Sequence, residues 1–346
     1  MNAVIPATLA ALTVDWFAQA LGLPVAKAEI EPVAFAGATT DLARVRLAYE
    51  DGAVGPTSVV AKITGQDEVR AAMDAAMGLF AREARFYAVF AEQVPVRAPR
   101  CFYVGDGRET PLLLEDLGRL RMGDQMEGLT IQDAERIIDA LAGLHAAFWN
   151  APALQQDWLL NPADPGFAGM VAHLVSSGGD ALRDRFTGRV PEESLQAVLR
   201  HAGDWQAVLA RGVEGPRTIA HHDARLDNIF FEPDGTPVFI DWQAVANARG
   251  THDIALLLTQ SMEVELLQKN WESLLRRYHA ELISRGVDDY SWDDCQRHYR
   301  QNVLFSLGAG MALLGAMDIG DGRGLGDAIV TRALNHIADV NAFDAL

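Results

Sequence analysis

Residues 221–228 of this chain read His-His-Asp-Ala-Arg-Leu-Asp-Asn, and Asp241 follows later, at the end of the apolar run Val-Phe-Ile. An aspartate can receive the hydrogen of an attacking hydroxyl, while an asparagine oxygen and a second carboxylate are ligands that magnesium prefers. Transfer of a phosphoryl group needs both, because the transferred group is polyanionic and must be neutralised and positioned. The order of residues therefore predicts phosphoryl transfer, with Asp223 as the base and Asn228 and Asp241 as metal ligands.

Two charged residues upstream extend this set. Residues 59–62 read Val-Val-Ala-Lys and end a predicted strand, a pattern in which the lysine contacts the phosphates of a nucleotide. Glu83, in the next helix, is expected to pair with Lys62 and orient it. Glu68 is the competing partner, but it stands at the helix start, where acidic residues interact with the helix dipole. The sequence therefore predicts ATP and Mg²⁺ as cofactors, with Lys62 and Glu83 in the nucleotide site.

The catalytic loop contains a second catalytic candidate, Arg225. A guanidinium two residues after Asp223 is expected to stabilise the charge on the transferring phosphoryl group. A salt bridge to Asp227 is the alternative. His221 is expected to brace the loop, and Asp253, at the start of a later helix, to cap that helix or brace the loop as well.

Two further segments are candidates for nucleotide binding. The loop 36–41 contains a glycine and two hydroxyl side chains, which would cover the phosphates, although a plain hairpin loop is the alternative. The segment 112–118 runs from an apolar strand into the connector between the predicted lobes. Its backbone groups are expected to hydrogen-bond adenine, an assignment made by position alone. The candidate residues in these two segments are Gly37, Thr39, Thr40, Glu115 and Leu117.

Composition limits the classes of partner. The net charge is −18, from 47 acidic and 29 basic residues, which argues against nucleic acid; an acidic surface suits a cationic substrate or simply solubility. The two cysteines are far apart, so no disulfide framework or zinc site is expected. The most apolar segment, 303–317, is shorter than the roughly 20 residues of a spanning helix. We expect a soluble, cytoplasmic monomer or homodimer that binds no membrane.

The pattern of elements predicts an α+β fold with two lobes. Strands are expected at 28–35, 42–49, 57–63, 101–104 and 111–114, with one long helix at 68–93. The remainder reads as mainly helical, apart from a hairpin at 229–240. The predicted helices there are 130–149, 166–176, 192–211, 263–285, 292–317 and 327–343. The predicted domains are a nucleotide-binding lobe with its hinge, 1–118, and a helical lobe with the catalytic loop and acceptor site, 119–346.

Several motifs give the chain a family resemblance. They are Leu114-Glu115-Asp116-Leu117, Leu144-His145-Ala146-Ala147-Phe148-Trp149, His221-x-Asp223-x-x-x-x-Asn228, Ile240-Asp241-Trp242-Gln243 and Gly250-x-x-Asp253-Ile254-Ala255. With these motifs the chain resembles the aminoglycoside phosphotransferase and choline kinase superfamily, most closely its ecdysteroid-kinase-like (choline-kinase-like) branch. The resemblance implies a protein-kinase-like fold and ATP- and magnesium-dependent phosphorylation of a hydroxyl on a small molecule.

Three departures from the family pattern bear on the acceptor. His222 stands where the family usually has glycine, and Arg225 stands where aminoglycoside enzymes usually have a second histidine. Trp242-Gln243 replaces the Phe-Gly of protein kinases, so a small-molecule kinase is indicated rather than a protein kinase. An aminoglycoside-resistance function is disfavoured.

Three functions remain open. The first is a kinase for an apolar alcohol, such as a sterol-like or hydroxyacyl compound; Phe148, Trp149 and Trp242 suggest an apolar wall, unless they pack in the core. The second is a pseudokinase-type module that binds nucleotide without turnover. The third is an aminoglycoside- or choline-type kinase for a cationic acceptor, which requires an acidic pocket. The carboxylates available for such a pocket are Asp288, Asp289, Asp293 and Asp294.

Overall fold

The computed structural model describes residues 6–33, 39–105, 111–317 and 324–346. Its chain divides into two compact units. The N-terminal unit comprises Met1–Arg121 with Val238–Ala244, and the C-terminal unit comprises Met122–Pro237 with Val245–Leu346. Asp241 therefore belongs to the same unit as Lys62 and Glu83. The functional division into lobes 1–118 and 119–346 stays a prediction.

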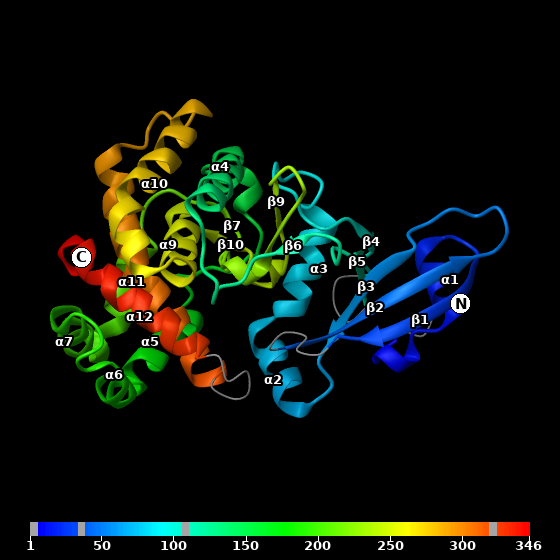
Figure 1. The fold of residues 1–346 in the computed structure, drawn as a ribbon, viewed down its shortest axis with the longest axis horizontal. Helices are drawn as coiled ribbons and strands as arrows, with labels where there is room; N and C mark the ends of the chain where they lie inside the picture. The colour runs from blue at the N-terminus through cyan, green and yellow to red at the C-terminus, as the bar shows by residue number, and fades with distance from the viewer. Residues whose placement is uncertain (1–5, 34–38, 106–110, 318–323) are drawn as a thin grey trace. The chain divides into compact units, whose positions relative to one another are not determined.

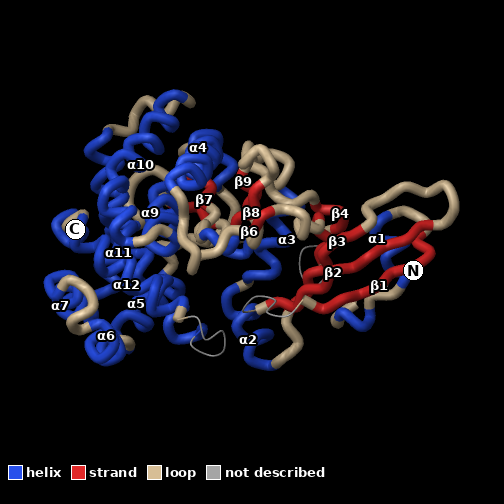
Figure 2. Tube along the Cα trace, in the orientation of Figure 1, coloured by secondary structure: helices blue, strands red, loops and turns tan. Residues whose placement is uncertain are grey.

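The N-terminal unit is built on an antiparallel sheet of five strands, coloured red in Figure 2. Along the sheet the strands follow the order β1-β2-β3-β5-β4. Their bounds are β1 Val25–Pro32, β2 Thr40–Tyr49, β3 Ser58–Thr64, β4 Cys101–Tyr103 and β5 Leu112–Glu115. The register places Lys62 of β3 between Leu42 of β2 and Leu112 of β5, so the lysine is anchored in the middle of the sheet.

Three helices of the N-terminal unit accompany the sheet: α1 Val14–Leu21, α2 Glu68–Met77 and α3 Leu79–Val89. Phe17 of α1 is fully buried in a core with Val45 and Val59 from the sheet. The single long helix expected over 68–93 is wrong, because Gly78 adopts a left-handed φ of 63° and separates α2 from α3. The break lets α3 take its own direction, and its buried face includes Glu83.

The C-terminal unit is mainly helical (Figure 1). Its helices are α4 Ile131–Ala147, α5 Pro165–Ser177, α6 Gly179–Phe186, α7 Glu192–His201, α8 Trp205–Gly212, α9 Gly250–Ser261, α10 Val264–Ser284, α11 Trp292–Met317 and α12 Leu325–Asp339. Every residue of α9 is buried, which makes it the central helix of this unit. The helix predicted over 192–211 is wrong as one piece, because a short 3₁₀ turn, Ala202–Asp204, separates α7 from α8.

Short strands carry the segments around the catalytic loop. The strands β7 (Thr218–Ala220) and β10 (Ala246–Ala248) pair antiparallel, and neither was predicted. The remaining short strands are β6 Arg121–Met122, β8 Ile229–Phe231 and β9 Pro237–Phe239. The catalytic loop begins directly after β7, so Asp223 is positioned by a strand that is itself fully buried.

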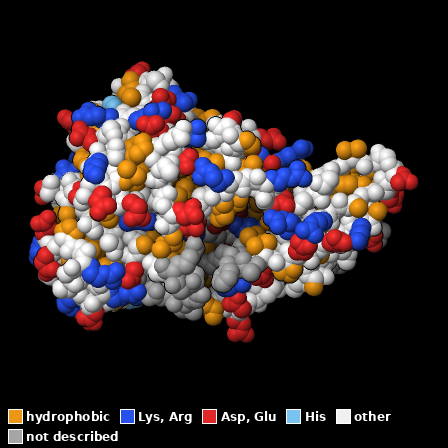
Figure 3. Space-filling view, viewed as in Figure 1, with side chains coloured by type: hydrophobic (Ala, Val, Ile, Leu, Met, Phe, Trp, Pro, Cys, Tyr) orange, Lys and Arg blue, Asp and Glu red, His pale blue; other side chains and the backbone are white. Residues whose placement is uncertain are grey.

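Charged side chains are dispersed over the face of the C-terminal unit that Figure 3 shows. Acidic and basic groups alternate over its face in Figure 3, among scattered apolar atoms. None of the helices in the described ranges is both long and apolar enough to cross a membrane.

Candidate active site

Lys62, Glu83 and Asp241 form a buried cluster in the N-terminal unit. The Nζ atom of Lys62 lies 2.6 Å from Oε2 of Glu83 and 2.7 Å from Oδ1 of Asp241. Lys62 is 6% exposed and Glu83 is 1% exposed. The ion pair that the sequence predicts between Lys62 and Glu83 is present. Because water is largely excluded, removing one member would leave an uncompensated charge in the interior.

The cluster holds two carboxylates for a single ammonium group. Burial alone lowers the pKa of Lys62, but the charges of Asp241 and Glu83 outweigh it and raise that pKa above its ordinary value. Burial raises the pKa of Glu83, and Lys62 only partly opposes this. The excess carboxylate charge would be met by a cation beside Asp241. A magnesium ion therefore fits the chemistry of this cluster.

Asp241 is held in an unusual backbone conformation. Its φ is 62°, in the left-handed region that an aspartate tolerates better than most residues. The Oδ2 atom accepts a hydrogen bond of 3.1 Å from Nε2 of Gln243, and Trp242 stacks on Phe86 of α3 at 4.0 Å. Trp242 is fully buried, so it packs in the core and does not form an acceptor wall. The stacking fixes the segment that presents Asp241.

The phosphate loop is described only in part. Thr39 and Thr40 are buried, and Oγ1 of Thr39 lies 3.5 Å from Oε1 of Gln243. Gly37 falls outside the described residues. Thr39 thus contacts the segment that carries Asp241, and the role of Thr39 and Thr40 in covering the phosphates stays a prediction.

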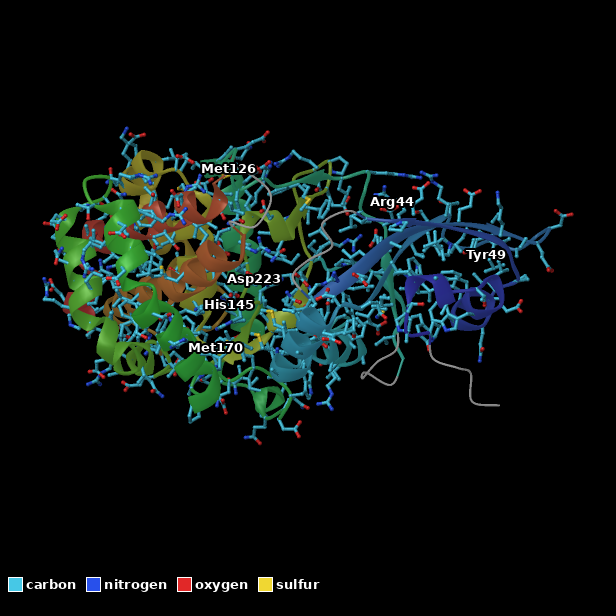
Figure 4. All side chains as sticks on the ribbon, turned by 90° about the horizontal axis from the view of Figure 1, so that it is seen from below. Arg44, Tyr49, Met126, His145, Met170 and Asp223 are labelled. Atoms are coloured by element: carbon cyan, nitrogen blue, oxygen red, sulfur yellow. The ribbon has the colours of Figure 1, made fainter. Side chains whose placement is uncertain are left out.

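The hinge segment follows β5. The carboxylate of Glu115 accepts two 2.7 Å hydrogen bonds from the guanidinium of Arg97, and its backbone N–H donates to the carbonyl of Arg100 at 2.8 Å. Asp116 accepts from Arg44, which is labelled in Figure 4. The N–H of Glu115 is therefore used within the sheet. The assignment of the backbone at Glu115 and Leu117 to adenine stays a prediction.

In the C-terminal unit, the carboxylate of Asp223 (labelled in Figure 4) is contacted on both oxygens. Nδ2 of Asn228 donates to Oδ2 at 2.8 Å and to the Asp223 carbonyl at 2.9 Å. Nε of Arg225 lies 3.3 Å from Oδ1. The side chain of Asp223 remains 25% exposed, enough for a substrate hydroxyl to reach it. The carboxylate is thus oriented before any substrate binds.

Both roles considered for Arg225 are compatible with its geometry. Its Nη1 lies 3.6 Å from Oδ2 of Asp227, so the salt bridge exists, and Nη1 also donates to Oε1 of Gln125 at 3.3 Å. Gln125 was not identified from the sequence, because it lies far from the loop along the chain and belongs to no motif. The guanidinium also contacts Asp223, and its role in phosphoryl transfer stays a prediction.

Asp253 of α9 holds the start of the catalytic loop through hydrogen bonds to its backbone. Its carboxylate accepts the backbone N–H groups of His221 and His222, both at 2.7 Å, and lies 3.2 Å from Nε2 of His145. Burial alone would raise the pKa of Asp253, but the hydrogen bond and charge of His145, with its histidine neighbours, lower it to about 2. Of the two roles expected for Asp253, the bracing of the loop is observed.

His222 occupies a backbone position that favours glycine. Its φ is 66°, and its ring stacks on the ring of His252 at 3.9 Å with 10° between the planes. Phe167 of α5 and Phe305 of α11 contact the His222 ring at its edges. Burial lowers the pKa of His252 to about 4, so the His252 ring is neutral at pH 7. The imidazole of His222 therefore fills apolar space directly beside Asp223.

The predicted metal ligands lie in different units, Asn228 in one and Asp241 in the other. Among the described residues there is no group of three or more His, Cys, Asp or Glu side chains that would bind a metal alone. The amide nitrogen of Asn228 is used by Asp223, and no described group donates to its Oδ1. Asn228 and Asp241 each offer a side-chain oxygen of the kind that magnesium prefers, and their role as metal ligands stays a prediction.

Comparison with solved structures identifies the fold. A choline kinase from Cryptosporidium parvum Iowa II matches with a TM-score of 0.59 and 12% identity, over 92% of this chain and 91% of that one. The choline kinase LicA from Streptococcus pneumoniae matches with 0.54 and 16%, over 94% and 96%. A GDP complex of an aminoglycoside 2′-phosphotransferase matches with 0.51 and 12%, over 96% and 98%. The fold is therefore protein-kinase-like.

Comparison of the sequence identifies the family. No curated protein matches this chain. Residues 35–286, well over half of the chain, match the Ecdysteroid kinase-like family. That family lies within the superfamily of small-molecule kinases to which choline kinases and aminoglycoside phosphotransferases belong. This chain belongs to the ecdysteroid kinase-like family.

Proposed function

We propose that the protein transfers the γ-phosphoryl group of ATP to the hydroxyl of a small, uncharged and largely apolar alcohol. The observation that carries this proposal is the carboxylate of Asp223, held between Asn228 and Arg225 and still open to solvent. A carboxylate oriented on both oxygens is suited to accept one hydrogen from a defined direction.

The two units supply different parts of the proposed reaction. Lys62, oriented by Glu83, binds the α- and β-phosphates, and Thr39 and Thr40 cover the phosphates. Asp241 and Asn228 are the proposed magnesium ligands. When bound, the ion neutralises charge on the phosphate oxygens. The backbone at Glu115 and Leu117 is assigned to adenine.

The proposed chemical step uses Asp223 and Arg225. The acceptor oxygen forms a bond to the γ-phosphorus as the bond to the β,γ-bridging oxygen breaks, and ADP leaves. Asp223 accepts the hydroxyl hydrogen through the oxygen nearest the acceptor. Arg225, at 3.3 Å from Asp223, is close enough to stabilise negative charge on the transferring group.

An uncharged acceptor is supported by the groups beside Asp223. The ring of His222, the residue before Asp223, packs against the buried Phe305 and the partly exposed Phe167, and the carboxylate of Asp253 is already contacted by two backbone N–H groups and by His145. A cationic amine would find no available carboxylate among these residues.

Two of the four aspartates considered for a cationic pocket line a cavity in the C-terminal unit. Asp289 and Asp294 line a cavity of about 380 Å³ with Trp149 and Tyr290. That cavity borders Gly215 and Pro216, which precede β7, whereas Asp223 follows β7. Asp294 also bonds Ser291 and Arg297 at the start of α11. These positions favour the apolar acceptor over the choline-type alternative.

The test is a transfer assay with γ-labelled ATP, magnesium and a panel of alcohols. The panel includes sterols, hydroxyacyl thioesters, choline and an aminoglycoside. The proposal predicts label in an uncharged alcohol, dependence on magnesium, and loss of transfer in Asp223→Asn. Label in choline or the aminoglycoside alone would establish the cationic alternative. Nucleotide binding with no transfer to any acceptor would establish the pseudokinase alternative.

A further inference from the structure

Gln125 is a fully buried glutamine that contacts the catalytic loop at two points. Its Oε1 accepts a hydrogen bond from Nη1 of Arg225 at 3.3 Å. Its backbone N–H donates to Oδ1 of Asp227 at 2.8 Å. Arg225 and Asp227 are themselves an ion pair, so one residue outside the loop contacts both partners. Figure 4 labels the next residue, Met126.

The glutamine is itself fixed by two helices of the C-terminal unit. Its Nε2 donates to the carbonyl of Gln260 in α9 at 3.2 Å. Arg332 of α12, also buried, donates through Nη1 to the carbonyls of Gln125 at 2.8 Å and Gln260 at 2.9 Å. A side chain anchored by its own amide and by its backbone has little freedom to move. The acceptor oxygen offered to Arg225 is therefore at a fixed place.

The position of this oxygen determines where the guanidinium points. Nη1 of Arg225 contacts Asp227 at 3.6 Å and Gln125 at 3.3 Å, which leaves Nε directed at Asp223. Without Oε1, Nη1 would lose an acceptor, and the long arginine side chain would gain rotational freedom. Its side chain is 16% exposed, so part of it is in contact with solvent.

We infer that Gln125 is a positioning residue for phosphoryl transfer: it holds the guanidinium of Arg225 against Asp223 and so keeps it aimed at the transferring group. The effect of Gln125 on catalysis rests on the proposed function. The positioning of Arg225 by Gln125 is a property of the protein without substrate. The two parts can therefore be tested separately.

The first measurement needs no turnover. Phenylglyoxal modifies accessible arginines, and peptide mass spectrometry gives the rate at each site. In Gln125→Met the rate at Arg225 should rise about tenfold, the effect of losing one hydrogen bond to a charged group. Gln125→Glu keeps an acceptor oxygen for Arg225 but loses the donor to the carbonyl of Gln260, so its rate should lie below that of Gln125→Met. Arg332 should remain protected in every variant, which separates local release from unfolding.

The matched control is Gln196→Met in α7, which removes a hydrogen-bonded glutamine from an exposed face of the same unit. It should leave the rate at Arg225 unchanged. Equal rates at Arg225 in wild type and Gln125→Met would overturn the inference. This result would do so whether or not the protein turns over ATP.

The second measurement is kinetic, with Arg225→Met, Gln125→Met and the double variant. Gln125→Met should lower kcat about tenfold with little change in KM for ATP. The double variant should be no slower than Arg225→Met, because Gln125 acts through Arg225. Additive losses would overturn the inference. Absence of turnover in wild type would instead contradict the proposed function, and the modification rates would still decide the positioning.

Discussion

The side-chain amide of Asn228 donates a 2.8 Å hydrogen bond to the carboxylate of Asp223. The same amide also bonds the backbone carbonyl of Asp223, so the loop closes on itself between these two residues. This leaves the amide oxygen of Asn228 as the atom for a metal. One side chain thus connects the proposed base with the proposed magnesium site.

Asn228→Ala should affect both the orientation of Asp223 and the proposed binding of magnesium. The variant loses a metal ligand and one of the two contacts on Asp223, so kcat should fall and the magnesium concentration for half-maximal rate should rise about tenfold or more. Titration of ATP turnover with magnesium measures both quantities. Asp223→Asn, which keeps the ligand, should bind magnesium–ATP normally. An unchanged magnesium requirement in Asn228→Ala would remove Asn228 from the metal site.

Lys62→Met should destabilise the protein strongly. The substitution leaves the carboxylates of Glu83 and Asp241 in the interior without their cation, a cost of about 3–5 kcal/mol in the free energy of unfolding. Urea denaturation monitored by circular dichroism measures it. Lys27→Met is the matched control, because Lys27 pairs with Glu29 at the surface and should change stability by less than about 1 kcal/mol. Equal effects of the two substitutions would contradict the buried cluster.

His252, which stacks on His222 of the catalytic loop, should make the stability of the fold sensitive to acid. The pKa of His252 is lowered from 6.5 to about 4 by burial, so between these values the unfolded chain binds a proton that the folded chain does not. Its contribution to stability is present above pH 6.5 and is lost as the pH falls toward 4. Wild type should therefore lose up to about 1.4 kcal/mol per pH unit more than His252→Asn in this window.

The two variants are compared in denaturant titrations at a series of pH values. The burial of Glu83 changes stability in the opposite sense in part of the same window, because its pKa is raised. The contribution of Glu83 is the same in wild type and in His252→Asn, so it cancels when their stabilities are subtracted. Parallel stability curves for wild type and His252→Asn would show that His252 does not titrate in this way.

The backbone at His222 predicts an unusual order of stabilities. Both His222→Gly and His222→Ala lose the stacked ring, so both should be less stable than wild type. At a φ of 66°, however, alanine retains the steric cost that glycine avoids. His222→Gly should therefore be about 1 kcal/mol more stable than His222→Ala, the reverse of the usual order. A more stable alanine variant, by thermal or chemical unfolding, would contradict the left-handed conformation.

The features that could be predicted from the sequence are those with a local pattern. The strand around Val45 alternates apolar and polar residues, and the spacing of Asp223 and Asn228 in their loop predicts the chemistry of that loop. The pairing of Lys62 with Glu83 also followed, because a lysine at a strand end and a glutamate on the next helix form a familiar arrangement.

The remaining features depend on contacts distant in the chain. The strands β7 and β10 have three residues each and exist because they pair with each other. Gly78 reads as a tolerated residue within a helix until its φ is known. Gln125 contacts Arg225 although the five helices α4 to α8 lie between the two residues along the chain. No local periodicity reports such contacts.

The central claim is that Asp223 is the base for phosphoryl transfer to a small-molecule hydroxyl. The most direct measurement is magnesium-dependent transfer of label from γ-labelled ATP to an alcohol, compared between wild type and Asp223→Asn under saturating substrate. The account predicts a decrease in kcat of about 10²–10⁴-fold with ATP affinity retained. Equal rates of transfer in the two proteins would contradict it.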